Sequence, residues 1–217
     1  MPDFTLEQEL GHDEGRLVIG IDEAGRGPWA GPVVAAAAWL DPHRIAPALS
    51  ERLDDSKKLS AKRRDALFEI LCDPACDFAA VAVGSASVAE IDSLNILQAS
   101  LLAMQRAAAA LTAALAVDPA TLAALVDGNR LPRLDCEARA VIKGDSRSLS
   151  IAAASIVAKV TRDRAMAAHA RAYPGYGWER NQGYGTAEHR AGIARLGITP
   201  LHRRSFRPVR ETLTLTS

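Results

Sequence analysis

Acidic residues stand at the ends of three apolar segments whose lengths suit β-strands. The acids and the segments they follow are Asp22 and Glu23 after residues 16–21, Asp127 after residues 122–126, and Asp145 two residues after residues 138–143. A carboxylate at the end of a buried strand is partly desolvated, and several at one sheet edge would repel one another. A divalent cation relieves that repulsion and prefers oxygen ligands. The pattern therefore indicates a metal site built from these four acids.

The local backbone has to bring all four side chains to one place. Adjacent residues on a regular strand point to opposite faces, so Asp22 and Glu23 can share a site only if the strand breaks at residue 23. We expect residues 24–25, Ala-Gly, to make that break. Gly128 and Gly144 stand next to the other two acids and would let backbone and substrate approach closely.

Each acid also has a purely structural interpretation. An aspartate at a strand end is commonly a helix cap or part of an Asx-turn, which would suit Asp145, and the Asp127-Gly128 pair is an ordinary turn sequence. Four acids that emerge from three expected strands are harder to explain as separate caps and turns. Their number favours the metal site over the structural alternative.

The expected chemistry is hydrolysis of a phosphodiester. Two Mg²⁺ ions about 4 Å apart can activate a water molecule and stabilise the leaving oxygen of an in-line displacement, so the protein needs no nucleophilic side chain. His189 and His202 lie in the basic C-terminal region. Either could assist proton transfer, and either could be structural, and the residues alone do not decide between these roles.

The loop Gly25-Arg26-Gly27-Pro28 gives a second indication of function. Glycines expose backbone N–H and C=O groups, and such groups can contact a ribose 2′-hydroxyl, which separates RNA from DNA. Arg26 could hold a phosphate. A glycine-rich turn of this kind is also common without any ligand, so the loop supports the hydrolase interpretation only together with the acids.

The surrounding elements alternate between strand and helix patterns. Apolar runs at residues 16–21 and 33–40, joined by a Gly/Pro turn, predict an antiparallel pair of strands. A third strand at residues 78–84 precedes a long helix that begins after the capping-box pattern at residues 87–90. Later strands reached through helices should be parallel. A further long helix is expected from about residue 148 to 172, and another helix at residues 187–196.

The composition limits the remaining possibilities. The 217 residues are 48% hydrophobic, which suits one domain with a real core. The 26 basic and 26 acidic residues cancel, so nucleic-acid binding must come from local patches, such as the seven arginines against three acids from residue 178 onward. Three cysteines without zinc spacing predict reduced thiols and a cytoplasmic protein. We see no signal peptide and expect no membrane-spanning segment.

Six segments, in order, resemble ribonuclease HII, the bacterial type 2 ribonuclease H. They are IGIDEAGRGPWAGPVVAAA at residues 19–37, DDSKKLS at 54–60, LVDGN at 125–129, IKGDSRSLSIAAASIVAKVTRD at 142–163, NQGYGTAEH at 181–189 and TPLHRRSFRPV at 199–209. The resemblance covers roughly residues 16–210, and DEAGRGP alone is quite specific. Trp29 is bulkier than the residue that many relatives carry there.

The resemblance implies a fold and a domain arrangement. The fold is an α/β, ribonuclease H-like, mixed five-stranded sheet flanked by helices, with a C-terminal helical extension over about residues 173–217. Residues 1–15 resemble nothing specific and are expected to be a flexible segment before a single catalytic domain at residues 16–217.

The resemblance also implies residue roles. Asp22, Glu23, Asp127 and Asp145 match the four metal-binding and catalytic acids of the family, with Asp22 bridging two ions of Mg²⁺ or Mn²⁺. The matching substrate-binding residues are Gly25, Arg26 and Gly27 of the ribonucleotide-reading loop, Tyr184 at the sugar on the DNA side of the junction, and Lys57 and Lys143 near the substrate backbone.

The implied substrates are RNA–DNA hybrids and duplex DNA that contains ribonucleotides. Cleavage falls 5′ of the ribonucleotide and leaves a 3′-hydroxyl and a 5′-phosphate, as in ribonucleotide removal during DNA replication and repair. No segment resembles a sliding-clamp-binding peptide, and we expect a monomer with no obligate protein partner and no membrane association.

Three other functions are consistent with part of the pattern. A non-catalytic hybrid-binding module would need basic residues but not four acids, because acids repel phosphate. A nucleotide hydrolase would need a GxxxxGK[ST] loop, and no Gly-Lys pair occurs in the chain. Another nuclease or a transposase could share the fold, and only the Gly25–Gly27 loop and Tyr184 argue against it.

Overall fold

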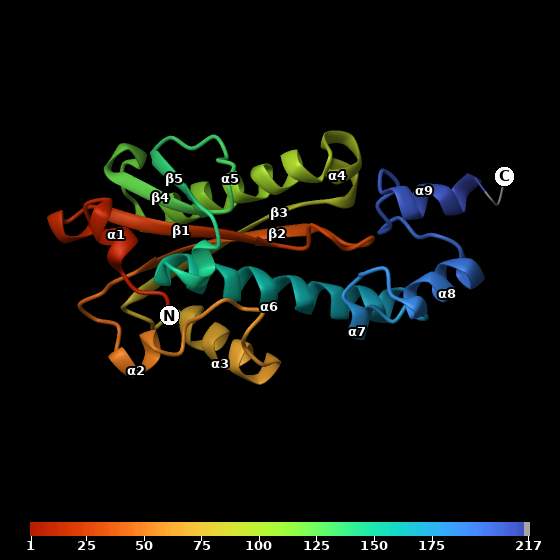
Figure 1. The fold of residues 1–217 in the computed structure, drawn as a ribbon, viewed down its shortest axis with the longest axis horizontal. Helices are drawn as coiled ribbons and strands as arrows, with labels where there is room; N and C mark the ends of the chain where they lie inside the picture. Colours follow the sequence, from red (N-terminus) through yellow and green to blue (C-terminus); the bar gives the residue numbers. More distant parts are fainter. Residues whose placement is uncertain (215–217) are drawn as a thin grey trace.

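A mixed five-stranded sheet forms the centre of the protein (Figure 1). The computed structural model describes residues 1–214. In the order β3-β2-β1-β4-β5, β1 pairs antiparallel with β2 and parallel with β4, β2 pairs antiparallel with β3, and β4 pairs parallel with β5. The strands are β1 Leu17–Ala24, β2 Val33–Leu40, β3 Ala79–Ala86, β4 Leu122–Asp127 and β5 Glu137–Val141. This topology confirms the predicted antiparallel pair and the parallel strands after the helical crossover.

Helices cover both faces of the sheet. Figure 1 shows α4 and α5 on one face, α6 with α2 and α3 on the other, and α7, α8 and α9 beyond one end of the sheet. The helices are α1 Thr5–Glu9, α2 Pro47–Ser50, α3 Ala61–Leu71, α4 Val88–Leu94, α5 Ile96–Leu115, α6 Leu149–Ala172, α7 Trp178–Asn181, α8 Ala187–Leu196 and α9 Arg207–Thr214. Short 3₁₀ turns are η1 His12–Glu14, η2 Pro119–Thr121 and η3 Gly144–Ser146. Within the described chain, none of these helices combines the length and apolar character that a membrane crossing needs.

Alternation along the central strands creates two apolar cores. Ile19 and Ile21 of β1 pack with α5, whereas the alternate residues face α6. The approach of α6 is so close that a Cβ added at Gly20 would overlap the backbone of Ser150. This contact fixes the beginning of α6 against the middle of β1, two residues before Asp22.

The long helix predicted after residue 87 is two helices. The chain interrupts it at Asn95, whose φ of 72° lies in the left-handed region, and the Asn95 side chain caps α5 by accepting a hydrogen bond from the Gln98 N–H. The capping box at Ser87 and Glu90 forms as predicted. The three-and-four spacing of apolar residues continues across the break, so periodicity alone could not reveal it.

Residues 1–15 are folded onto the domain, in contrast to the flexible segment expected. Glu7 is 1% exposed, and its Oε1 accepts hydrogen bonds from Ser148 Oγ at 2.6 Å and from Ser150 N and Oγ at 3.0 and 2.6 Å. The Leu149 N–H also donates to the Asp3 carbonyl. The segment therefore caps the start of α6 through contacts between residues 141 and 143 positions apart, which local sequence patterns cannot predict. At the other end, residues 215–217 of the expected C-terminal extension lie outside the described residues.

The Glu7 contacts generate a stability prediction. Replacing Glu7 with Ala leaves buried donors of Ser148 and Ser150 without their acceptor, which costs about 1–3 kcal/mol and should lower the melting temperature by several degrees. Glu9→Ala, in the same helix, removes only the exposed ion pair with Arg139 and should shift it by less than about 2 °C. Thermal unfolding followed by circular dichroism compares the two variants. Equal shifts would show that the Glu7 cap contributes nothing special.

Candidate functional site

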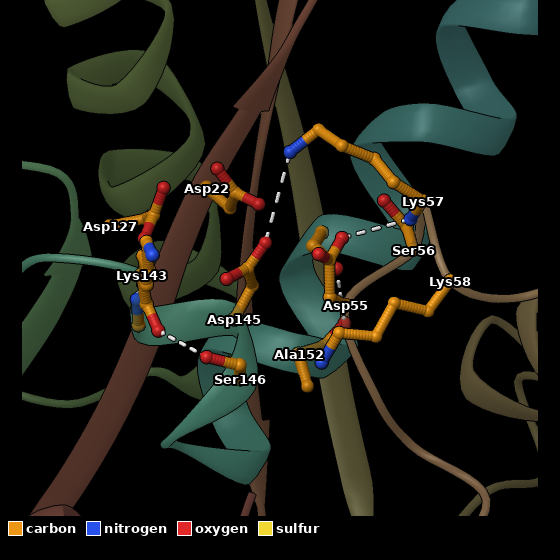
Figure 2. A network of polar contacts seen from close by, with 12 residues as sticks. Asp22, Asp55, Ser56, Lys57, Lys58, Asp127, Lys143, Asp145, Ser146 and Ala152 are labelled. Carbon is orange, nitrogen blue, oxygen red and sulfur yellow. Dashed lines mark hydrogen bonds and ion pairs between the residues drawn. The ribbon is translucent and has the colours of Figure 1, made fainter. Parts of the chain in front are cut away.

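The parallel pairing of β1 with β4 places Asp22 beside Asp127. The last pair of that ladder is Ile21 with Val126, and the two aspartates are the next residue on each strand. Neighbouring strands lie about 4.8 Å apart. Residues two positions apart on a strand point to the same face. Asp127 therefore shares a face with Leu125, which packs against Ile151 of α6, and Asp22 shares a face with Gly20, which lies against Ser150. Both aspartates face the α6 side of the sheet. Figure 2 shows Asp22 and Asp127 close together, with Asp145 beside them.

Asp145 reaches this place from the turn η3, which connects β5 to α6. The Gly144 N–H in that turn donates a 2.7 Å hydrogen bond to Asp127 Oδ1, so the turn is tied directly to the end of β4. A Cβ at Gly144 would come within 2.5 Å of Ile151 Cδ1, so a larger residue there would require the Ile151 side chain to move. Asp145 is 6% exposed and Asp22 is 5% exposed.

Glu23 adjoins the other acids without the predicted strand break. It still pairs with Ala35, and β1 continues to Ala24, so the expected break at residue 23 is wrong. The chain turns only at Gly25, where φ is +101°. Glu23 belongs to the opposite face, yet at the end of the strand it shares a pocket with Asp22 and pairs with Arg26 at 3.2 Å.

Burial, and then the charges of neighbouring acids, raise the pKa values of Asp22, Glu23 and Asp145. Burial raises the pKa of Asp22 well above its ordinary value, and the charges of Glu23, Asp127 and Asp145 raise it further. Burial also raises the pKa of Glu23, against the opposing effect of Arg26. For Asp145, burial and the charges of Asp55 and Asp127 raise the pKa to about 6. Asp22 is thus the acid on which the other three charges converge.

Lys57 faces the acids from the loop before α3. Its Nζ lies 3.8 Å from Asp145 Oδ2, and Figure 2 shows the side chain extended toward the aspartates. Although burial opposes it, the charges of Asp22, Asp55, Asp145 and Asp127 raise the pKa of Lys57. Asp55 accepts a hydrogen bond from the Lys57 N–H and is a neighbour of the site that sequence reasoning missed. The sequence feature that could have indicated Asp55 is the pair of aspartates in DDSKKLS, but such a pair is equally typical of a polar turn.

Four carboxylates suit a hard divalent cation. In this structure, however, their oxygens do not all point to one position. Within residues 1–214, no three histidine, cysteine or acidic side chains are placed closely enough together to hold a metal ion. Each acid instead has a partner within the protein. Asp22 accepts from the Glu23 N–H and Asp127 from the Gly144 N–H, whereas Glu23 pairs with Arg26 and Asp145 with Lys57. Three carboxylates that share one face, two of them almost fully buried, nevertheless fit a site completed by positive charge.

A pocket of about 310 Å³ begins at Asp22 and Glu23 and extends along the Gly25–Gly27 loop to Tyr184. Tyr184 is 48% exposed and lies beside Gly27, where an added Cβ would come within 3.4 Å of its ring. The structure thus brings most of the predicted residues together, while Asp127 and Asp145 lie just outside this pocket and Lys143 lies in the turn before Asp145. The remaining residues of the pocket wall are Ala24, Ser56, Lys57, Ser155, Lys159 and Arg162.

His189 and His202 lie in a separate buried cluster and do not line the acidic pocket. Their Nε2 atoms are 3.1 Å apart, and His189 Nδ1 lies 3.0 Å from the Tyr184 carbonyl. His202 Nδ1 accepts from the Thr199 N–H, so a neutral His202 donates through Nε2 to His189, which in turn donates to Tyr184. Burial and then the neighbouring His189 lower the pKa of His202 to about 4. The histidine pair therefore holds the Tyr184 backbone, and neither ring reaches the acidic pocket to transfer a proton there.

Comparisons with known proteins agree with this arrangement. A family profile described as Ribonuclease HII matches residues 19–209. The Ribonuclease HII of Rhodospirillum rubrum is 61% identical over 214 residues, which are 98% of this chain and 92% of that protein. The crystal structure of the ribonuclease H2 from Pyrococcus horikoshii OT3 superimposes with a TM-score of 0.68 at 27% identity, covering 92% of this chain and 98% of that one.

A second structural relative was solved with a partner. The PCNA:RNase HII complex from Archaeoglobus fulgidus contains a chain that matches with a TM-score of 0.65 at 25% identity, over 88% of this chain and 95% of that one. Together with the sheet order and the flanking helices, these neighbours confirm the predicted ribonuclease H-like fold.

The raised pKa of Asp145 predicts an unusual pH dependence of stability. Because the folded state binds this proton more tightly than the unfolded state does, the wild type loses stability as the pH rises from about 4 through about 6. Asp145→Asn removes that loss, so in a chelator at pH 8 it should melt about 2–4 °C higher than the wild type, and at pH 4 at nearly the same temperature. Asp135→Asn, on the surface far from the site, is the matched control. A variant that is less stable than the wild type at pH 8 would contradict the repulsion among these acids.

Proposed function

This chain belongs to the ribonuclease HII family, and we propose that its acidic site cuts the RNA strand of RNA–DNA hybrids and the bond 5′ of single ribonucleotides in duplex DNA. The family makes it an endoribonuclease, a hydrolase of phosphodiester bonds that acts on RNA–DNA hybrids. The observation that carries the finer proposal is the meeting of Asp22, Asp127 and Asp145 on one face, beside a loop of exposed backbone.

The proposed cofactor is a pair of Mg²⁺ or Mn²⁺ ions held by Asp22, Glu23, Asp127 and Asp145. Bound there, divalent ions supply an activated water and neutralise the charge that develops on the leaving oxygen. Asp22 would be the central acid of this set, because it is buried and the charges of the other three all act on it. Lys57 and Arg26, which now pair with Asp145 and Glu23, are free to turn to the substrate phosphates once cations neutralise the acids.

The proposed substrate selection comes from the other end of the pocket. Backbone groups of Gly25, Arg26 and Gly27 contact the ribose 2′-hydroxyl, and Tyr184 stacks on the next sugar on the DNA side. Lys143, in the turn before Asp145, contacts the substrate backbone. Hydrolysis 5′ of the ribonucleotide leaves a 3′-hydroxyl and a 5′-phosphate, the outcome that ribonucleotide removal from DNA requires.

The proposed working state is a monomer in the cytoplasm with no obligate protein partner. The four acids and the Gly25–Gly27 loop all lie within one chain, which supports a site that a single copy can form. The PCNA complex of the Archaeoglobus protein raises a clamp partner as an alternative for this chain, which co-purification with the matching clamp would reveal.

The direct test is cleavage of a duplex that contains one ribonucleotide. With Mg²⁺ or Mn²⁺ we expect a single cut 5′ of that residue, with a 3′-hydroxyl and a 5′-phosphate on the products, and no cut in EDTA. Asp22→Asn should reduce the rate by at least about a thousandfold, since it removes the central ligand, while its circular dichroism stays native. Wild-type turnover in this variant, or full activity in EDTA, would refute the proposed site.

The position of Tyr184 predicts a selective loss. Tyr184→Ala should reduce kcat/KM for a single embedded ribonucleotide by about tenfold or more, since base or sugar stacking contributes about 1–3 kcal/mol, and should affect a long hybrid less. Tyr184→Phe keeps the ring and serves as the control that retains wild-type selectivity. Equal losses on both substrates would show that Tyr184 does not recognise the junction.

A further inference from the structure

Two buried arginines hold the Gly25–Pro32 loop from behind. Arg203, in the segment between α8 and α9, is 0% exposed, and Arg162 of α6 is 1% exposed. Every side-chain hydrogen bond of both guanidinium groups goes to a backbone carbonyl. Burying a charged side chain costs free energy unless hydrogen bonds satisfy its donors. An apolar side chain would fill the same space without that cost, so the carbonyl contacts themselves are the reason to place arginine here.

Arg203 contacts four carbonyl groups of one loop. Its Nη2 donates to Gly25 O at 2.6 Å and to Pro32 O at 3.1 Å, its Nη1 to Arg26 O at 3.0 Å, and its Nε to Gly31 O at 2.9 Å. Only a planar fork of five N–H groups can reach acceptors spread in this way. Arg203 thus connects both ends of the loop that lines the acidic pocket.

Arg162 supports the same loop from the side of α6. Its Nε donates to Pro32 O at 3.1 Å, its Nη2 to Ala30 O at 3.2 Å, and its Nη1 to Gln182 O at 3.0 Å, two residues before Tyr184. A Cβ at Gly25 would overlap the Arg162 guanidinium, so the backbone at Gly25 lies directly on this side chain. The loop and the Tyr184 segment are therefore fixed relative to each other.

The carbonyl contacts determine where the N–H groups of the loop point. In a trans peptide the C=O and the N–H of the same unit point in opposite directions. Because the Gly25 and Arg26 carbonyls turn inward to the buried Arg203, the N–H groups of Arg26 and Gly27 turn outward, at residues that line the pocket. Neither N–H has a hydrogen-bond acceptor within residues 1–214.

From this geometry we infer that Arg203 is a positioning residue for ribonucleotide selection. It orients two consecutive backbone donors, the N–H groups of Arg26 and Gly27, toward an oxygen of the ribonucleotide. The inference rests on the proposed function, because it assumes that the loop contacts the ribose. Lysine in place of Arg203 would keep the charge but could not reach four carbonyls at once, so the donor pair would lose its fixed direction.

The test compares the affinities for RNA-containing and all-DNA duplexes in one assay. KM is measured on a duplex with one ribonucleotide, and Ki is measured for the same duplex without it as a competitor. In the wild type Ki should exceed KM. Arg203→Lys should lower the ratio Ki/KM by about tenfold, through a higher KM and an unchanged Ki, whereas mere destabilisation would lower the active fraction and leave the ratio intact. Arg204→Lys, the exposed neighbour, is the matched control.

The outcomes separate the two proposals. A wild-type ratio near one would refute ribonucleotide selection itself. A wild-type ratio well above one that stays unchanged in folded Arg203→Lys would overturn only the positioning role. Should Arg203→Lys fail to fold, amide hydrogen exchange of the wild type decides: Arg26 and Gly27 should become protected on binding the ribonucleotide duplex and not the all-DNA duplex. Equal protection by both duplexes, or none, would overturn the inference.

Discussion

The parallel pairing of β1 with β4 forces Asp22 and Asp127 to emerge side by side, and their mutual repulsion determines much of the surrounding structure. The turn η3 adds Asp145 to the same face, and burial removes the water that would screen these charges. Three groups of the protein partly offset these charges: Lys57 pairs with Asp145, Arg26 pairs with Glu23, and the Gly144 N–H donates to Asp127. Burial and the charges of Glu23, Asp127 and Asp145 still raise the pKa of Asp22 well above its ordinary value. Close, buried carboxylates cost folding free energy, and a bound divalent cation would lower that cost. This difference is the structural basis for metal binding at the site.

The segments that we propose to select the substrate are far apart in the sequence. The loop of residues 25–32, the middle of α6 at Arg162, residues 182–184 and the chain before α9 meet behind the pocket. Arg162, Arg203 and His189 hold these segments through backbone carbonyls rather than through ion pairs. Fixed backbone donors lose little freedom on binding, which is what recognition of one hydroxyl group requires.

The sequence predicted what depends on local pattern and could not predict what depends on tertiary contact. Acids at the ends of apolar runs predicted the residues that meet at the sheet edge, and the Gly/Pro turn predicted the antiparallel pair. The continuation of β1 through Glu23 depends on pairing with β2, and the break at Asn95 leaves the apolar spacing unchanged. The roles of Glu7 and Arg203 arise from contacts more than 140 residues away along the chain, so neither had a local signal.

The most direct test of the central claim is to locate bound cations. Crystals soaked in Mn²⁺ should show anomalous scattering peaks within coordination distance of the Asp22 carboxylate, with Asp127, Glu23 or Asp145 completing each site and Lys57 displaced from Asp145. Asp22→Asn crystals treated in the same way should lose these peaks. Mn²⁺ bound only elsewhere on the protein, with the acids still paired to Arg26 and Lys57, would contradict the account.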